Sequence, residues 1–128
     1  MQLFVAFQIL CYTPGKEVKM GDYHYSKEGM SKLAKLYELK PELLQPFLDF
    51  NGKVFADGAL STKVKELIAV AAAHVTQCPY CIASHTKNAK KAGASDEEIA
   101  EAIFVATALR AGGALAHSSI AIEALEEK

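Results

Sequence analysis

Apolar side chains recur at helical spacing along most of the chain from residue 28 onward. A spacing of three or four positions is typical of a helix with one apolar face. It predicts a first helix over residues 28–39 and a second from Pro41, ended by Asp57–Gly58, with Asn51–Gly52 as a candidate interruption. The positions that carry this periodicity are Met30, Leu33, Leu36, Tyr37, Leu43, Leu44, Phe47, Leu48 and Phe55.

Two further helices follow, and their ends carry clear signals. Ser61 is a good N-cap for a helix over residues 62–76, whose apolar body, Leu67 to Val75, is typical of a helix buried in a core or an oligomer. Pro79 suits the first turn of the next helix, which should run to about residue 92 and end at Gly93.

The last helical stretch covers residues 96 to about 125. Ser95 and Glu98 have the spacing of a capping box at its start, and Gly112–Gly113 predicts a kink or a close approach of another helix. No convincing strand period follows residue 12. We therefore predict an all-α fold of five to six helices in one domain over residues 1–128, with 28–125 as its helical core.

Residues 1–27 are predicted to be an irregular N-terminal extension. The apolar run from Leu3 to Cys11 lacks the basic start and the small-residue cleavage site of a signal peptide, and it is too short to span a bilayer. We expect it to lie against a neighbouring subunit, or to be extra sequence from an upstream start site. Cys11 is then a small buried apolar residue.

Composition narrows the classes of function. A net charge of −1 and the absence of Trp disfavour a nucleic-acid binder, and the Lys residues at 87, 90 and 91 are offset by nearby acids. Three cysteines, two of them in a CxxC pair, fit a reducing cytoplasm better than a secreted disulfide scaffold. We predict a cytoplasmic protein that needs neither nucleic acid nor membrane.

The densest chemistry lies at Cys78, Cys81 and His85. At about 100° per residue these three side chains fall within roughly a 60° sector of one helix. A helix N-terminus favours thiolate, and a base one turn from Cys81 can take its proton. Glu66, in the preceding helix, is placed to orient that base. The alternatives are a zinc site completed by His74 or His117, and a Glu66 that is only a surface residue.

These residues, together with the sequences around them, resemble the AhpD-like branch of the carboxymuconolactone decarboxylase family over about residues 40–125. The resemblance rests on a Glu-x11-Cys-x2-Cys-x3-His pattern between a DGAL lead-in and an AGAS turn. The residues that carry it are Asp57–Ser61, Lys65–Ile68, Cys78–Cys81, His85, Ala92–Ser95, Glu98–Ile99 and Glu101–Ile103.

The resemblance implies an all-helical homo-oligomer, a trimer or hexamer, that acts as an alkyl hydroperoxide or disulfide reductase. In that scheme Cys81 attacks the peroxide, Cys78 resolves, and Glu66 and His85 relay the proton. It implies no bound cofactor and no metal. Electrons are returned by a lipoyl-type or thioredoxin-like dithiol, so the implied partners are an electron-donor protein and a small hydroperoxide or disulfide.

Some features leave other interpretations open. The helix dipole alone favours Cys78 as the more acidic thiol. The branch has a histidine just before its second cysteine, where this chain has Tyr80, which implies a shorter relay or weaker peroxidase activity. A decarboxylase-like enzyme and a non-catalytic redox-sensing oligomer remain the alternative functions, since one fold hosts several functions.

Overall fold

The structure is a computed structural model that describes Gly29 and residues 32–127. Those residues are helical, without a strand, as the sequence predicts. The predictions for residues 1–27, including Leu3 to Cys11, lie outside the described part. The helices are α3 (Leu33–Leu39), α4 (Pro41–Phe55), α5 (Thr62–Thr76), α6 (Pro79–Lys91), α7 (Asp96–Ala116) and α8 (Ser118–Glu126).

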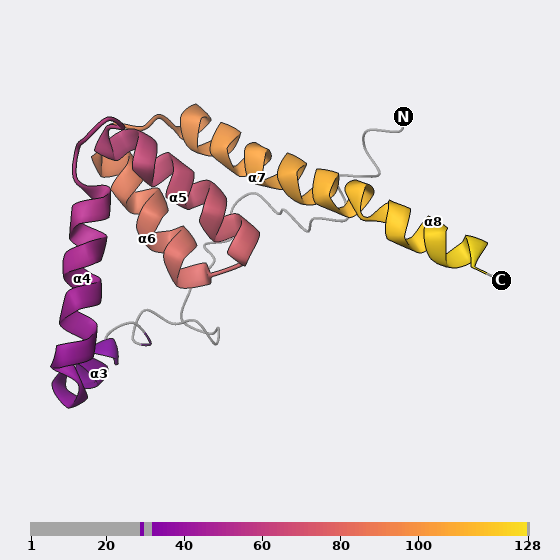
Figure 1. Ribbon diagram of the computed structural model, residues 1–128. Helices are drawn as coiled ribbons and strands as arrows, with labels where there is room; N and C mark the ends of the chain where they lie inside the picture. Colours follow the sequence, from indigo (N-terminus) through magenta and orange to yellow (C-terminus); the bar gives the residue numbers. More distant parts are fainter. Residues whose placement is uncertain (1–28, 30–31, 128) are drawn as a thin grey trace, which may run out of the picture.

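The centre of the molecule is α5, which packs against both α6 and the first half of α7 (Figure 1). Its Val70 is fully buried and forms the core with Ala89 of α6, with Ala94 just before α7, and with Ile99 near the start of α7. Most of these side chains are small, so the helices can approach closely while the buried apolar area stays modest. Partly buried side chains around this core are Leu67, Ala102 and Ile103.

Local signals in the sequence set the helix ends as predicted. Ser61 Oγ accepts the Val64 N–H at 3.3 Å, and Ser95 with Glu98 completes the capping box. Gly93 follows α6 with φ at +89°, a left-handed conformation that glycine adopts without a Cβ clash. These caps satisfy N–H groups that a helix start leaves without an intrahelical partner, which is why the boundaries are sharp.

Two pairs of helices extend away from this core (Figure 1). The α3–α4 pair leaves from the start of α5 and runs down the left of the view, and the second half of α7 continues with α8 toward the right. Large apolar side chains on both pairs are exposed within the single chain, in contrast to the core. They include Leu43, Phe47, Phe50, Leu109, Leu115, Ile120 and Leu125.

Two glycine-containing positions that the sequence singled out do not break their helices. The helix α4 continues through Asn51–Gly52, and α7 continues through Gly112–Gly113. Within the described residues, a Cβ added at either Gly112 or Gly113 would meet no atom within 4 Å, so neither is a close-packing site inside this chain. The interruption lies instead at His117, between α7 and α8. The helix formers on both sides of the glycines outweigh their cost of about 1 kcal/mol each.

By length and composition alone, the segment Asp96–Glu126 is apolar enough to cross a membrane, and 11% of its most apolar window is buried. The first half of α7, however, contributes Ile99 and Ala106 to buried positions within the chain. The unburied part is therefore mainly the second half of α7 together with α8.

Candidate functional site

The turn between α5 and α6 sets the position of the CxxC pair. Gln77 has φ at 56° and ψ at 40°, the left-handed conformation that ends α5, and the Cys78 N–H then donates to Ala73 O at 3.1 Å. Cys78 is the N-cap of α6, and Pro79 occupies its first turn without losing a hydrogen bond. The chain thereby reverses, and α6 lies alongside α5 (Figure 1).

The two cysteines are joined by a disulfide but differ in their surroundings. Cys78 Sγ accepts the Cys81 N–H at 3.4 Å, so this sulfur caps the N-terminus of α6. Backbone N–H groups at a helix start stabilise negative charge on such a sulfur. Cys81 lies inside the first turn and contributes to the wall of a pocket. The Cys78 sulfur is therefore suited to carry negative charge as a thiolate. The Cys81 sulfur is accessible from the pocket.

Glu66 and His85 meet across the α5–α6 contact. The Glu66 Oε2 and His85 Nδ1 atoms are 2.7 Å apart, and the Glu66 residue is only 4% exposed. The interpretation of Glu66 as a surface residue is therefore wrong. A carboxylate at Nδ1 selects the tautomer that carries its proton there, which leaves Nε2 as the basic nitrogen. The pair thus has the arrangement of an oriented general base.

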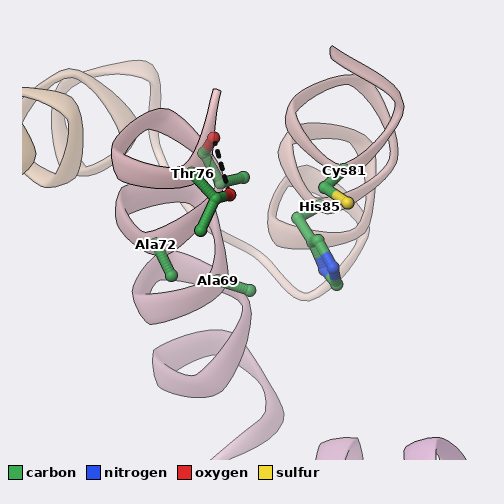
Figure 2. A pocket seen from close by; sticks show the side chains of 6 residues that line it. Ala69, Ala72, Thr76, Cys81 and His85 are labelled. Carbon is green, nitrogen blue, oxygen red and sulfur yellow. Dashed lines mark hydrogen bonds between the residues drawn. The ribbon is translucent and has the colours of Figure 1, made fainter. Parts of the chain in front are cut away.

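A pocket of about 190 Å³ brings Cys81 and His85 together with one face of α5 (Figure 2). The α5 side of the pocket consists of small side chains, and Thr76 at one end donates its hydroxyl to Ala73 O at 3.3 Å. A small molecule with an apolar group can therefore lie along α5 while a polar atom meets the sulfur and the imidazole. The remaining lining residues are Ala69, Ala72 and Ala73.

Phe55 belongs to the site, although the sequence pattern placed it only on the apolar face of the second helix. Its ring stacks on the His85 imidazole, with centroids 5.0 Å apart and planes at 25°. The Thr62 hydroxyl donates to Phe55 O at 2.9 Å, and Lys65 Nζ donates to Ala56 O at 2.5 Å. These bonds fasten the end of α4 to the first turn of α5. The Phe55–His85 contact joins residues 30 positions apart in the sequence, so no local pattern predicts it.

Other candidates lie outside the pocket or support it from behind. His74 Nδ1 is 2.7 Å from Val70 O, consistent with a hydrogen-bonded residue in a helix contact. Arg110 Nη1 donates to Val75 O at 2.5 Å and so links α7 to the end of α5. Tyr80 lies against Gly29, where a Cβ would collide with the Tyr80 hydroxyl. Among the residues that the structure describes, no three His, Cys, Asp or Glu side chains are placed to hold a metal ion.

Charged groups around the start of α5 are also perturbed. The Asp57 carboxylate accepts the Thr62 N–H at 2.7 Å, and this bond lowers the pKa of Asp57. The Lys63 ammonium, 2.7 Å from Glu98, lowers the pKa of that carboxyl, with a further contribution from the Ser95 N–H. Both interactions lie at the first turns of α5 and α7, and neither is part of the pocket.

Comparisons with known proteins agree with this architecture. The profile of the Carboxymuconolactone decarboxylase family matches residues 41–124. A crystal structure of an apo carboxymuconolactone decarboxylase family protein from Legionella pneumophila is 38% identical, with a TM-score of 0.63 over 78% of this chain and 89% of that one.

Two further relatives are similar at the level of sequence or structure. A crystal structure of a Methanobacterium thermoautotrophicum protein is 35% identical, with a TM-score of 0.63 over 66% of this chain and 96% of that one. An uncharacterized protein of the cox locus of Paracoccus denitrificans is 56% identical over 81 residues, which are 63% of this chain and 73% of that protein.

Proposed function

This chain belongs to the carboxymuconolactone decarboxylase family, and within that family we propose that it is an AhpD-like thiol–disulfide oxidoreductase that reduces alkyl hydroperoxides or disulfides. The observation that carries the proposal is the Glu66–His85 hydrogen bond beside Cys81, in a pocket that both Cys81 and His85 line. A buried acid, an oriented imidazole and a CxxC pair together form an activated thiol with its own resolving partner.

The peroxidase cycle begins with Cys81. His85 takes the thiol proton, and the Cys81 thiolate attacks the terminal oxygen of the hydroperoxide, so that an S–O bond forms and the O–O bond breaks. The proton held by His85 goes to the leaving alkoxide, which departs as an alcohol. Cys81 is left as a sulfenic acid, and the Cys78 thiol attacks its sulfur, which releases water and forms the Cys78–Cys81 disulfide.

An external dithiol closes the cycle. One donor thiolate attacks Cys78, forms a mixed disulfide with it and releases the Cys81 thiolate. The second donor thiol then displaces Cys78, and the donor leaves as a disulfide. The substrate gains two electrons and the donor loses two, so no bound cofactor is required. We propose a lipoyl-type or thioredoxin-like protein as this donor, in the reducing cytoplasm.

The different surroundings of the two sulfurs support this division of roles. Cys81 shares the pocket with His85, whereas Cys78 lies at the helix start, where the Cys81 N–H points at its sulfur. Helix-dipole reasoning alone favours Cys78 as the more acidic thiol, but acidity also makes it the better leaving group. The pocket and the base therefore favour Cys81 as the attacking atom.

The test is a thiol titration with mass analysis before and after one equivalent of an alkyl hydroperoxide. In the reduced wild-type protein we expect rapid loss of two thiols and a Cys78–Cys81 disulfide. Cys81→Ser should lose no thiol at that rate, and Cys78→Ser should stop at a Cys81 sulfenic acid, which a dimedone adduct would reveal. Full peroxide turnover in Cys81→Ser would overturn the mechanism.

Two alternatives are separated by the same variants. A decarboxylase-like activity would survive in a Cys78→Ser/Cys81→Ser double variant, because that chemistry does not use the pair. A redox sensor would form the disulfide and change its oligomer size without turning over peroxide. Family membership alone is compatible with all three functions, so the thiol chemistry decides among them.

We also propose that this protein is a homo-oligomer, a trimer or hexamer, whose subunits cover the exposed α7–α8 segment. A bilayer is the poorer partner for that segment because Arg110 lies within it, and a charged side chain at the bilayer centre is costly. The first half of α7 is also tied to α5 through Lys63 and Glu98. Other copies of the chain can bury this apolar area without placing Arg110 in a bilayer and without separating α7 from α5.

A further inference from the structure

We propose that Phe55 is a positioning residue for the base: its ring holds the His85 imidazole in the orientation that directs Nε2 to the thiol. This inference rests on the proposed thiol chemistry and adds to it a residue from a third helix. Phe55 is the last residue of α4, directly before the connection that leads into α5.

One hydrogen bond limits the motion of an imidazole but does not stop it. The bond between Glu66 Oε2 and His85 Nδ1, 2.7 Å long, holds one ring nitrogen, and small rotations about the His85 side-chain torsions can still tilt the ring. The Phe55 ring, with centroids 5.0 Å apart and planes at 25°, blocks that movement from one face. Hydrogen bond and stack together define both the position and the tilt of the ring, and proton transfer depends on both.

The same stack shields one face of the imidazole. Phe55 covers this face with carbon atoms, while the pocket that His85 lines together with Cys81 is open. The ring nitrogens donate and accept protons in the plane of the ring, so the stack leaves Nδ1 bonded to Glu66 and leaves the ring edge free for proton transfer.

The position of Phe55 is itself fixed by α5. The Thr62 hydroxyl donates to Phe55 O at 2.9 Å, and the Thr62 N–H donates to the Asp57 carboxylate at 2.7 Å. Glu66 lies one turn further along the same helix. One short stretch of α5 thus places both groups that hold His85, and this makes the contact a built feature rather than incidental packing.

The test compares Phe55→Leu, which keeps apolar bulk without a ring, with Phe55→Tyr, which keeps the ring. Phe50→Leu is the matched control, because Phe50 lies on the same helix and is 64% exposed. The first readout is the His85 tautomer in the reduced protein, followed by nitrogen-15 NMR. The second is the rate at which Cys81 reacts with an alkyl hydroperoxide.

We expect the wild type, Phe55→Tyr and Phe50→Leu to show one His85 tautomer, protonated at Nδ1. Phe55→Leu should show a mixture, and its Cys81 reaction should slow by about tenfold, since a misplaced base loses part of the gain from general-base catalysis. A purely structural role would lower the melting temperature of Phe55→Leu while the tautomer and the rate at low temperature stayed at wild-type values. That result would overturn the proposal.

Failure of the proposed function gives a different pattern. If the wild type itself does not react with hydroperoxide while Phe55→Leu still disturbs the tautomer, the redox enzyme is wrong and the positioning role stands. If the wild type reacts and Phe55→Leu reacts equally fast with an unchanged tautomer, the positioning role is wrong and the redox enzyme stands. The two proposals therefore fail separately.

Discussion

The α5–α6 contact and the α7–α8 segment are both helical but differ in what their side chains meet. At the α5–α6 contact, Glu66 is buried and bonded to His85, and Val70 is fully enclosed. On α7–α8, Leu109, Leu115 and other large side chains are exposed, and few residues of the segment are buried. The chemistry is completed within one chain, whereas the apolar surface is not.

This difference shows which property depends on which level of structure. A buried carboxylate needs a partner inside the chain, because leaving it unpaired costs several kcal/mol. An exposed leucine has no such need in the single chain, but a contiguous row of them is a surface for association. Site geometry should therefore survive in a dissociated subunit, while stability should depend on assembly.

The largest expected effect is on assembly. Leu115→Glu puts a charge on a side chain that is 74% exposed in the single chain, and burial of that charge between subunits is unfavourable. We expect the oligomer to dissociate to a mass near 13.8 kDa by light scattering. Lys91→Gln, on α6, changes the net charge equally and should leave the mass of the oligomer unchanged.

Two results would contradict this prediction. A wild type that is already a monomer at micromolar concentration would show that other copies do not cover the α7–α8 segment. Retention of full oligomer mass in Leu115→Glu would place the subunit contact elsewhere. In the dissociated variant, formation of the Cys78–Cys81 disulfide should still occur, because the residues of the pocket come from one chain.

The next effect is on the site. Glu66→Gln keeps the shape of the side chain but removes the charge that supports a protonated His85. We expect the reaction of Cys81 with hydroperoxide to slow by about a hundredfold, the usual size of a general-base contribution. Glu101→Gln, on the exposed face of α7, is the control. A wild-type rate in Glu66→Gln would mean that His85 needs no carboxylate partner.

Sequence alone predicted the parts of this molecule that depend on neighbours along the chain. The caps at Ser61 and Ser95 and the ends of α5 and α6 follow from local hydrogen bonds, so periodicity and capping residues were sufficient. Cys81 and His85 lie one turn apart on α6 and line the same pocket for the same reason, whereas Cys78 is the N-cap of that helix. Their catalytic roles, like that of Glu66, stay predictions until the thiol chemistry is measured.

What the sequence did not predict depends on packing between distant segments. Phe55 has the same periodicity as Phe47, and no local pattern distinguishes the ring that meets His85 from the one that stays exposed. The helix α7 continues through Gly112–Gly113, because helix propensity sums over a whole segment and two glycines did not outweigh their neighbours. For Phe55, tertiary contacts are the missing information.

A smaller effect concerns the free energy of unfolding, which should differ between substitutions in the core and in the α7–α8 segment. Val70→Ala removes two methyl groups from a fully buried position and should lower the free energy of unfolding by about 2 kcal/mol. Leu125→Ala, at a side chain 81% exposed, should change it by less than about 0.5 kcal/mol. Both are measured by urea unfolding in the Leu115→Glu background, where the α7–α8 segment has no partner subunit. Equal losses at the two positions would remove the distinction.

The smallest effect concerns the ion pair that ties α7 to the core. The Lys63 ammonium lowers the pKa of Glu98 below the 4.5 of the unfolded chain, so the folded state favours the ionised carboxyl. The resulting stability is present above that value and is lost as pH falls through the lower folded pKa. Because both side chains are more than a third exposed, salt should weaken the effect.

Glu98→Gln keeps an oxygen that can accept the Ser95 N–H, and it removes the charge together with the second oxygen, which accepts from Lys63 Nζ. Its melting temperature should lie slightly below that of the wild type at neutral pH, and the gap should close as the pH falls below 4.5. A gap that persists unchanged into acid would mean that the capping hydrogen bond, rather than the charge, holds the start of α7. In that case the first half of α7 is held in place without the Lys63–Glu98 ion pair, and that pair adds nothing to the contrast with the exposed α7–α8 segment.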